Sequence, residues 1–219
     1  MKRTLVVFVK WPRPGTVKTR LSVDLGPETS AAVYRALAEA EIAGTQPRAG
    51  DYDRVFFYAP ADAAADIARW LPGETLQAQD GPDLGARMAA AFDAAFAAGA
   101  DQVAIVGTDV PWVTRDTVLQ AFEILDERDV VLGPCEDGGY YLLALSRPAP
   151  GLFEEIAWST PGVLDATRDR AQALGLSLAT LGTLPDIDTL ADVRLAWDEL
   201  RPLLPEAVAD LLGPRLRSG

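Results

Sequence analysis

Short, nearly continuous apolar runs recur along the chain and predict β-strands that are buried on both faces. The first run is Thr4–Lys10, which is rich in valine, and a similar run lies at Gln102–Gly107. The other predicted strands are, in chain order, Arg54–Ala59, Thr75–Ala78, Val130–Gly133, Tyr140–Leu145 and Ser177–Leu181.

Between these runs lie longer stretches whose apolar residues recur at three- and four-residue spacing, as in amphipathic helices. The predicted helices are Pro27–Ala43, Asp62–Trp70, Leu84–Ala98, Thr114–Asp126, Val163–Leu174, Leu190–Leu200 and a weak one at Pro205–Leu212. Strands that alternate with helices predict an α/β fold with a mostly parallel, twisted sheet flanked by helices. We expect one domain over residues 1–219, a small antiparallel element near residues 135–145, and a peripheral C-terminal tail from about residue 202.

Charge and composition narrow the chemistry that this fold could carry. The chain has 20 lysines and arginines against 32 aspartates and glutamates, a net charge of −12, and no histidine. This acidic balance argues against a general nucleic-acid binder, which displaces counterions from phosphates with a basic surface. Without histidine, Ser-His-Asp and Cys-His catalysis and His-ligated metal sites are excluded within the chain. A bound metal would need oxygen ligands, which favours Mg²⁺ or Mn²⁺.

The single cysteine and the start of the chain give expectations about location. Cys135 has no partner for an intrachain disulfide, and a free cysteine is typical of a reducing compartment, so we expect a cytoplasmic protein. The apolar run Leu5–Val9 is interrupted by Lys10 and Pro12. This pattern indicates neither a signal peptide nor a membrane span.

Polar clusters follow several of the predicted strands, where ligands bind in open α/β sheets. The first cluster is the predicted loop over residues 11–20 and the residue before it, with four cations: Lys10, Arg13, Lys18 and Arg20. Arginine forks and a lysine charge at this place would cradle the phosphates of a nucleotide. The alternative is a solvated loop whose cations offset nearby acids. The loop is not a Walker A motif, because Val17 precedes Lys18.

Two carboxylates from different loops are candidate metal ligands. Asp109 directly follows the strand Gln102–Gly107, and Asp188 precedes the helix predicted from residue 190. A divalent ion held by both would bridge phosphate oxygens and neutralise the charge of a leaving group. The alternative is that Asp109 forms a turn or cap and that Asp188 opens its helix as an N-cap.

The segment between the strands at residues 130–133 and 140–145 combines acids with two glycines. Its Asp-Gly pair predicts a hairpin turn, and Asp137 is a candidate general base for an acceptor hydroxyl, or a reserve metal ligand. A second polar segment, at residues 158–160, precedes a predicted helix and either lines a pocket or simply starts that helix. The candidate lining of an acceptor pocket is Gly138, Gly139, Tyr140, Trp158, Ser159 and Thr160.

Six motifs, in order and spread over nearly the whole chain, together resemble a known family. They are K-W-P-R-P-G-T-V-K-T-R-L (10–21), D-G-P-D-L-G-A-R-M (80–88), I-V-G-T-D-V-P (105–111), L-G-P-C-E-D-G-G-Y-Y-L-L (132–143), W-S-T (158–160) and D-I-D-T-L-A-D-V (186–193). The set is similar to the bacterial glycosyltransferase-like family of the nucleotide-diphospho-sugar transferase (GT-A) superfamily, often labelled arsenosugar biosynthesis glycosyltransferases. The resemblance implies a single Rossmann-like GT-A domain, a nucleotide-bound donor and a divalent metal.

This resemblance favours a metal-dependent transferase that moves a glycosyl group from a nucleotide-diphospho-sugar to a small acceptor. We expect Lys10, Lys18 and Arg20 to bind donor phosphates. We expect Leu84, Gly85 and Arg87, at the start of a helix whose amides favour an anion, to bind the nucleotide. The alternative for Arg87 is an exposed helix cation. Asp109 is expected to be catalytic as the main metal ligand, with Asp188 as the second ligand.

The loop pattern is also similar to guanylyltransferases that act on phospholactate and to molybdenum-cofactor nucleotidyltransferases. The alternative activity is therefore transfer of a nucleotidyl group from NTP to a small phosphorylated acceptor, with release of pyrophosphate. GT-A glycosyltransferases usually carry D-x-D after the central strand, where this chain reads Thr108-Asp109-Val110. A second alternative is a non-catalytic nucleotide-binding regulator. The sequence leaves the base, the sugar, the acceptor and the oligomeric state open.

Overall fold

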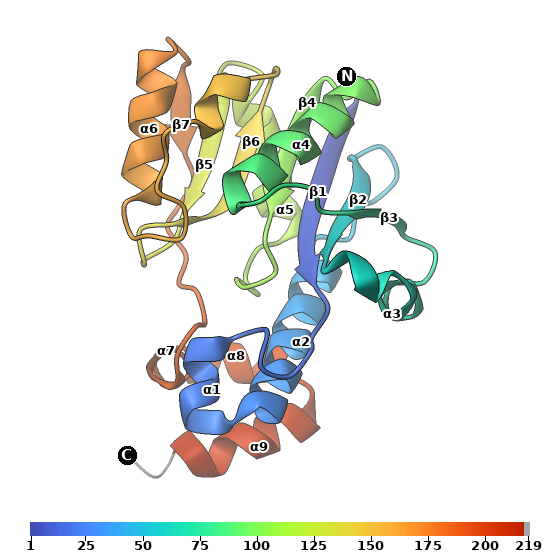
Figure 1. Cartoon of the computed structure of the whole chain (residues 1–219), viewed down its shortest axis with the longest axis vertical. Coiled ribbons are helices and arrows are strands. Elements are labelled where there is room, and N and C mark those ends of the chain that lie inside the picture. The colour runs from blue at the N-terminus through green and yellow to red at the C-terminus, as the bar shows by residue number, and fades with distance from the viewer. Residues whose placement is uncertain (217–219) are drawn as a thin grey trace.

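A seven-stranded sheet forms the centre of the protein in a computed structural model that describes residues 1–216 (Figure 1). The strands are β1 (Arg3–Lys10), β2 (Asp53–Ala59), β3 (Thr75–Ala78), β4 (Gln102–Val106), β5 (Val130–Pro134), β6 (Tyr140–Leu145) and β7 (Leu178–Thr180). Their order is β3-β2-β1-β4-β6-β5-β7. Strand β6 runs antiparallel to both neighbours, whereas the other pairs are parallel. The predicted mostly parallel α/β fold and the antiparallel element are thereby confirmed.

Helices cover both faces of this sheet and one of its ends. The α-helices are α1 (Thr19–Leu25), α2 (Pro27–Gly44), α3 (Ala64–Trp70), α4 (Leu84–Ala97), α5 (Arg115–Ile124), α6 (Val163–Ala173), α7 (Leu190–Leu195), α8 (Trp197–Leu200) and α9 (Glu206–Leu216). Short 3₁₀ turns lie at Ala61–Ala63, Pro150–Phe153 and Arg201–Leu203. Among residues 1–216, none of the helices combines the length and the apolar character needed to cross a membrane.

Alternate residues of β1 enter two different cores, which explains its continuous apolar sequence. Leu5, Val7 and Val9 pack on the face covered by α3 and α5, where Phe122 is fully buried. Val6 and Phe8 pack on the opposite face against α4, where Phe92 is buried. Successive side chains of a strand point to opposite faces, so a strand covered on both sides needs apolar residues throughout.

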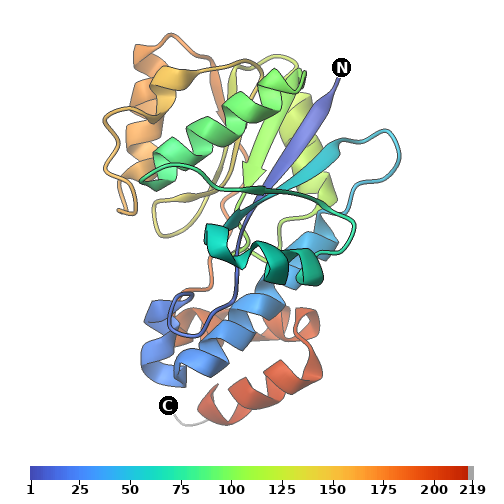
Figure 2. The ribbon, with the colours of Figure 1, turned by 45° about the vertical axis from the view of Figure 1, so that its right-hand side comes forward.

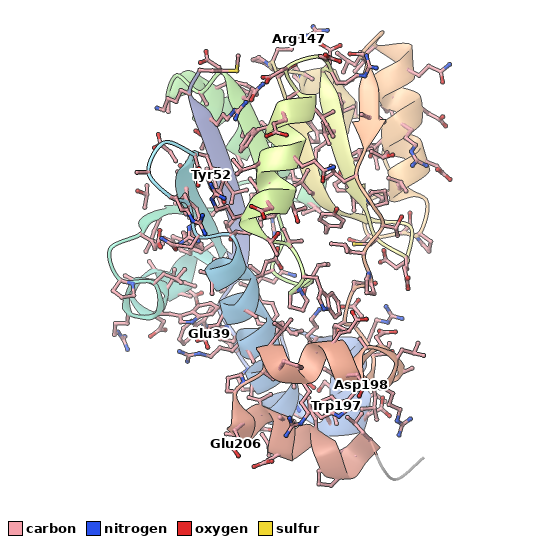
Figure 3. All side chains as sticks on the ribbon, turned by 180° about the vertical axis from the view of Figure 1, so that it is seen from behind. Glu39, Tyr52, Arg147, Trp197, Asp198 and Glu206 are labelled. Carbon is pink, nitrogen blue, oxygen red and sulfur yellow. The ribbon has the colours of Figure 1, made fainter. Side chains whose placement is uncertain are left out.

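A cluster of helices from the two ends of the chain lies beyond the carboxyl ends of the parallel strands (Figure 2). It consists of α1 and α2 together with α7, α8 and α9, and it has a separate apolar core. This core includes Leu21, Leu37, Ile187, Val193 and Leu212. In Figure 3, Trp197, Asp198 and Glu206 lie at this end and Arg147 lies at the opposite end. The cluster therefore forms a floor below the edge where ligands are expected.

Two features differ from the expected elements. The predicted loop over residues 11–20 ends at Lys18, and the short helix α1 follows it without having been predicted. The weak helix expected at Pro205–Leu212 extends over Glu206–Leu216, and its Leu212 is fully buried. The predicted peripheral tail thus packs into the helical core as far as it is described, and residues 217–219 lie outside the described residues.

Candidate active site

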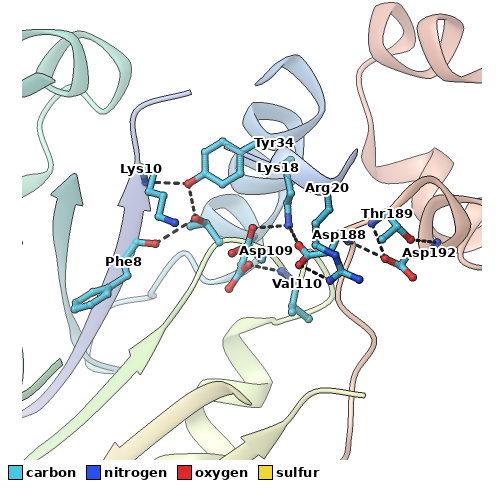
Figure 4. Close-up of polar contacts among 12 residues, drawn as sticks. Phe8, Lys10, Lys18, Arg20, Tyr34, Asp109, Val110, Asp188, Thr189 and Asp192 are labelled. Atoms are coloured by element: carbon cyan, nitrogen blue, oxygen red, sulfur yellow. Dashed lines mark hydrogen bonds and ion pairs between the residues drawn. The ribbon is translucent and has the colours of Figure 1, made fainter. Parts of the chain in front are cut away.

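Two carboxylates and one ammonium group meet at the carboxyl edge of the sheet (Figure 4). Asp109 lies on the loop after β4, Asp188 lies on the loop between β7 and α7, and Lys18 lies directly before α1. The Lys18 Nζ atom is 2.5 Å from Asp109 Oδ1 and 2.9 Å from Asp188 Oδ1. Three segments far apart in the sequence therefore converge on one ion-pair cluster, which we call the Lys18 cluster.

Backbone geometry sends the Lys18 side chain inward. Lys18 has φ +46° and ψ +48°, a left-handed conformation that a non-glycine residue adopts at a cost of about 1–2 kcal/mol. Its side chain is only 2% exposed, while Leu21 and Leu25 of the following helix are anchored in the helical core. The anchored helix and the two carboxylates together hold a strained residue in place.

The charges of this cluster stabilise one another. Burial alone would lower the pKa of Lys18, but the carboxylates of Asp109 and Asp188 outweigh it and raise this pKa above its ordinary value. The Asp109 side chain is about half exposed. The protein around it nevertheless disfavours the ionised carboxylate, which by itself would raise the pKa of Asp109. The Lys18 ammonium outweighs that effect and holds the pKa of Asp109 below its ordinary value.

Asp109 and Asp188 do not cap the helices that follow them. Other residues cap α5 and α7. Thr189 accepts a hydrogen bond from the Asp192 amide, and the Asp192 carboxylate accepts one from the Thr189 amide, so this pair caps α7. Thr114 caps α5. Asp188 instead directs its carboxylate to Lys18 and to Arg20, whose NH1 atom lies 3.3 Å from Oδ2.

The donor set at this place fits a hard divalent cation. The ammonium nitrogen contacts one oxygen of each carboxylate, so a cation can reach both. Within residues 1–216, no group of three or more His, Cys, Asp or Glu side chains is arranged to hold a metal ion. Asp109 and Asp188 would supply two oxygen ligands to Mg²⁺ or Mn²⁺. Because no third side chain of this kind is in place, phosphate oxygens and water would complete the shell.

Three cavities share Asp109 in their walls. The wide cavity, of about 720 Å³, is lined by Arg20, Asp137, Gly139, Tyr140, Ser159, Thr160 and Asp186, among others. The narrow cavity, of about 370 Å³, is lined by Lys10, Gln79, Asp83, Leu84, Arg87, Tyr140 and Ser159, among others. The cationic cavity, of about 220 Å³, is lined by Lys10, Lys18, Arg20, Tyr34 and Asp188, among others. Most of the predicted site residues are thus brought together around one point.

Three predicted site residues lie behind these walls. A side chain at Gly85 would overlap the indole of Trp158, so this glycine lets α4 pack directly under the ring. Trp158 also stacks on Phe153 in the core. Gly138 has φ +88°, and a side chain there would meet the Pro161 carbonyl. Gly85, Gly138 and Trp158 shape the walls but are not among the residues that line the three cavities.

The loop that carries Asp137 is the turn of the predicted hairpin between β5 and β6. Asp137 Oδ1 accepts a hydrogen bond of 2.8 Å from the Gly139 amide, which fixes the carboxylate inside the turn. The hairpin and the candidate base are therefore compatible.

Arg13, one of the four predicted loop cations, lies away from the site. It forms an ion pair of 3.4 Å with Asp62 and lines none of the three cavities.

Two further acids at the site were not assigned a role from the sequence. Asp186 lines the wide cavity, and partial burial together with Asp137 and Asp188 raises its pKa to about 6. Glu41 is 1% exposed on α2 and accepts a hydrogen bond from the Val110 amide at 3.1 Å. A glutamate on the apolar stripe of a helix was the available signal, since Glu41 follows the buried Leu37 by four residues.

Glu41 gives a prediction about stability and pH. Burial raises its pKa well above the ordinary value, so the folded protein holds a proton that the unfolded chain releases above pH about 4.5. Protonated Glu41 therefore contributes its full share of the free energy of unfolding below this pH. That share decreases as the pH rises from the unfolded-state pKa to the folded-state pKa. Glu41→Gln keeps an acceptor for Val110 without this cost. We expect its free energy of unfolding to exceed wild type by about 1–3 kcal/mol at pH 8 and to match it near pH 4.

Urea unfolding at several pH values measures this difference. Glu39→Gln is the matched control, since Glu39 is an exposed residue of the same helix, and its effect should stay small at each pH. A Glu41→Gln protein that is less stable than wild type at pH 8 would mean that Glu41 is ionised in the folded protein.

Comparison with known proteins places this chain in a family. The family model described as "Uncharacterized protein conserved in bacteria (DUF2064)" matches residues 42–160. A crystal structure from Desulfovibrio desulfuricans G20, provisionally assigned as a nucleotide-diphospho-sugar transferase, shares 30% identity and a TM-score of 0.90. The match covers 99% of this chain and 98% of that chain.

Two other proteins are similar over most of their lengths. The phosphoenolpyruvate guanylyltransferase of Sphaerobacter thermophilus is 29% identical over 87% of this chain and 91% of its own. A 4-diphosphocytidyl-2C-methyl-D-erythritol synthase from Anaerococcus prevotii is 9% identical with a TM-score of 0.56, over 91% of this chain and 99% of its own, and shows the fold alone. The chain therefore belongs to the DUF2064 family and is a transferase with the fold of the nucleotide-diphospho-sugar transferases.

Proposed function

We propose that the protein is a metal-dependent nucleotidyltransferase, which moves a nucleoside monophosphate from NTP to a small acceptor and releases pyrophosphate. The observation that carries this proposal is the meeting of three cavities at Asp109, one of them lined by three cations. Nucleotidyl transfer needs three such places: one for the nucleoside, one for the acceptor and one for the departing pyrophosphate. The likeness to a guanylyltransferase supports the same activity.

In this proposal each cavity binds one part of the reactants. The narrow cavity takes the nucleoside, with Arg87 in its wall held by a hydrogen bond of 3.0 Å to the Gly81 carbonyl. The cationic cavity takes the β- and γ-phosphates, on which Lys10, Lys18 and Arg20 converge. The wide cavity takes the acceptor. The α-phosphorus then lies beside Asp109, between the attacking acceptor oxygen and the departing pyrophosphate.

The chain's own residues position the reacting groups in this scheme. Asp109 and Asp188 would hold the divalent ion, which would supply neutralisation of the charge that develops on pyrophosphate. Lys18 and Arg20 bind the departing pyrophosphate. The acceptor hydroxyl forms a bond to the α-phosphorus as the bond to the bridging oxygen breaks. Asp137 and Asp186 both line the wide cavity, where a carboxylate accepts the proton of that hydroxyl.

Glycosyl transfer from a nucleotide-diphospho-sugar is the second candidate. The 30% identity with the Desulfovibrio protein favours it. In this case the diphosphate lies along the Lys18 cluster and the sugar occupies part of the wide cavity. The leaving group is then a nucleoside diphosphate.

Product analysis separates these functions. The protein is incubated with each NTP, or with UDP-, GDP- and dTDP-sugars, together with Mg²⁺ or Mn²⁺ and a panel of phosphorylated and hydroxylated acceptors. Pyrophosphate release from an NTP supports nucleotidyl transfer, whereas release of a nucleoside diphosphate from a sugar donor supports glycosyl transfer. Calorimetric binding without turnover across the panel supports a nucleotide-binding regulator and contradicts both.

Arg20 gives a prediction about donor affinity. Its side chain is 63% exposed, and Arg20 lines both the wide and the cationic cavity. Arg20→Ala removes a charge-assisted contact with phosphate of about 1.5–3 kcal/mol, so donor affinity should fall roughly tenfold to a hundredfold. Calorimetry at fixed salt measures this change. Arg13→Ala is the matched control, because Arg13 lies in the loop before α1, pairs with Asp62 and lines none of the three cavities; it should change affinity less than about twofold. Equal affinities for Arg20→Ala and wild type would remove Arg20 from the donor site.

A further inference from the structure

We propose that Lys18 occupies the metal position until the donor arrives, and that its ammonium group then moves to the donor phosphates as the divalent ion replaces it. Metal and nucleotide would consequently bind as one unit, and the free protein would bind metal weakly. This inference rests on the proposed function, because it assigns the exchange to the same donor site. It concerns the state before any chemistry, so binding measurements test it without turnover.

The first argument is that one position cannot hold both cations. Lys18 Nζ contacts Oδ1 of Asp109 at 2.5 Å and Oδ1 of Asp188 at 2.9 Å. A divalent ion bound by both side chains would need oxygen atoms of these same carboxylates at about 2.0–2.1 Å, as is usual for Mg²⁺. The ammonium and the ion would then be in contact with each other. Occupancy of this position is therefore exclusive.

The second argument concerns charge. Without a cation, the carboxylates of Asp109 and Asp188 would face each other next to the acidic Asp186 and Asp137. Lys18 removes this repulsion in the free protein, and a metal that arrives alone must displace it and leave a buried ammonium group without its partners. The phosphates of a donor offer the ammonium new partners. Binding of the donor and binding of the metal therefore favour each other.

The third argument is that the ammonium group has a place to go. Lys18 forms part of the wall of the cationic cavity, of about 220 Å³, together with Lys10 and Arg20. Its four-carbon stem is flexible, so rotation of the side chain can carry the ammonium into this cavity while α1 stays anchored in the helical core. The same residue can then contact the carboxylates in one state and phosphates in the other.

Mn²⁺ binding measured by electron paramagnetic resonance, without nucleotide, tests the exchange. Lys18→Met removes the competing ammonium, so Mn²⁺ should bind about tenfold to a hundredfold more tightly than to wild type. Lys10→Met is the matched control, because Lys10 lines the same cavity and, among the described residues, forms no ion pair with either carboxylate. It removes the same charge and should tighten Mn²⁺ binding less than about threefold.

The same titration with a non-hydrolysable NTP analogue tests the coupling. In wild type the analogue should increase Mn²⁺ affinity at least about tenfold, and in Lys18→Met this increase should largely disappear while the analogue itself binds more weakly. Unchanged or weaker Mn²⁺ binding by folded Lys18→Met would overturn the exchange. If Lys18→Met tightens Mn²⁺ binding but no nucleotide binds wild type, the donor coupling and the proposed function fail and the exclusive occupancy stands.

The wild-type protein provides a second readout if Lys18→Met does not fold. The chain has three lysines, at positions 2, 10 and 18, so ¹⁵N-detected ammonium signals are few, and Lys2→Arg and Lys10→Arg assign them. The buried Lys18 ammonium should give a protected signal in the free protein. This signal should shift when the NTP analogue and Mg²⁺ are added together, and little with Mg²⁺ alone. An equal shift with Mg²⁺ alone would contradict the coupling, and the absence of any shift would contradict the exchange.

Discussion

An Asp109→Asn variant should fold like wild type and lose at least about a hundredfold in Mg²⁺-dependent turnover. A neutral amide oxygen is a much poorer ligand for a hard cation than a carboxylate, and Asp109 lies where the three cavities meet. The amide still fits the loop after β4, and Thr114, not Asp109, caps the following helix. The loss should therefore appear mainly in metal and donor binding. The melting temperature should fall modestly, because Asp109 no longer offsets the buried Lys18 ammonium while Asp188 still does.

Calorimetric titration of donor at several Mg²⁺ or Mn²⁺ concentrations, beside thermal melts, measures both properties. Asp116→Asn is the matched control, because the Asp116 side chain is 88% exposed on α5 and pairs with Arg115 away from the site. It should bind donor as wild type does. If Asp109→Asn kept full divalent dependence, Asp109 would have to be removed from the site and the proposed metal position would be wrong.

A Leu212→Ala variant should lose about 2–5 kcal/mol of unfolding free energy, a large share of the 5–15 kcal/mol of a typical domain. Leu212 is fully buried in the core of the helical cluster, although it lies seven residues from the end of the chain. Truncation to alanine leaves a cavity against α2, the helix that carries Tyr34 and Glu41 below the site. The tail should therefore behave as part of the fold.

Urea unfolding followed by circular dichroism measures this loss. Leu211→Ala is the matched control, because Leu211 precedes Leu212 on α9 and is 50% exposed. The control should cost at most about 0.5 kcal/mol. Equal, small effects of the two substitutions would mean that α9 lies loosely on the protein in solution.

Apolar runs predicted the strands well because burial on two faces leaves a strong pattern. The runs at Thr75–Ala78 and Tyr140–Leu145 have the bounds seen in the structure. The helix Thr19–Leu25 was missed for a physical reason: its N-cap is Lys18 in a left-handed conformation without a side-chain cap, so the usual polar start signal is absent. Its stability comes from burying Leu21 and Leu25 in a core that distant segments supply.

Prediction of the site succeeded for residue types and fell short for partners. Strand ends indicated Asp109 and Asp188 as neighbours of a cationic loop, and the structure brings both to Lys18. No local pattern tells that this ammonium takes the position between them, because the contacts span 91 and 170 residues of sequence. Trp158 was expected to line a pocket. Its indole instead packs on α4, because Gly85 has no side chain to occupy that space.

The floor below the site is assembled from the two ends of the chain, and this has a consequence for synthesis on the ribosome. Translation supplies all seven strands by residue 180, but Asp188 and the helices α7, α8 and α9 emerge last. Because a domain generally folds as a unit, a nascent chain should complete neither its fold nor the proposed metal position until these last segments have left the ribosome. A product cut short before residue 186 would therefore lack Asp188 and the last helices of the floor, and it should neither fold fully nor carry out the proposed transfer.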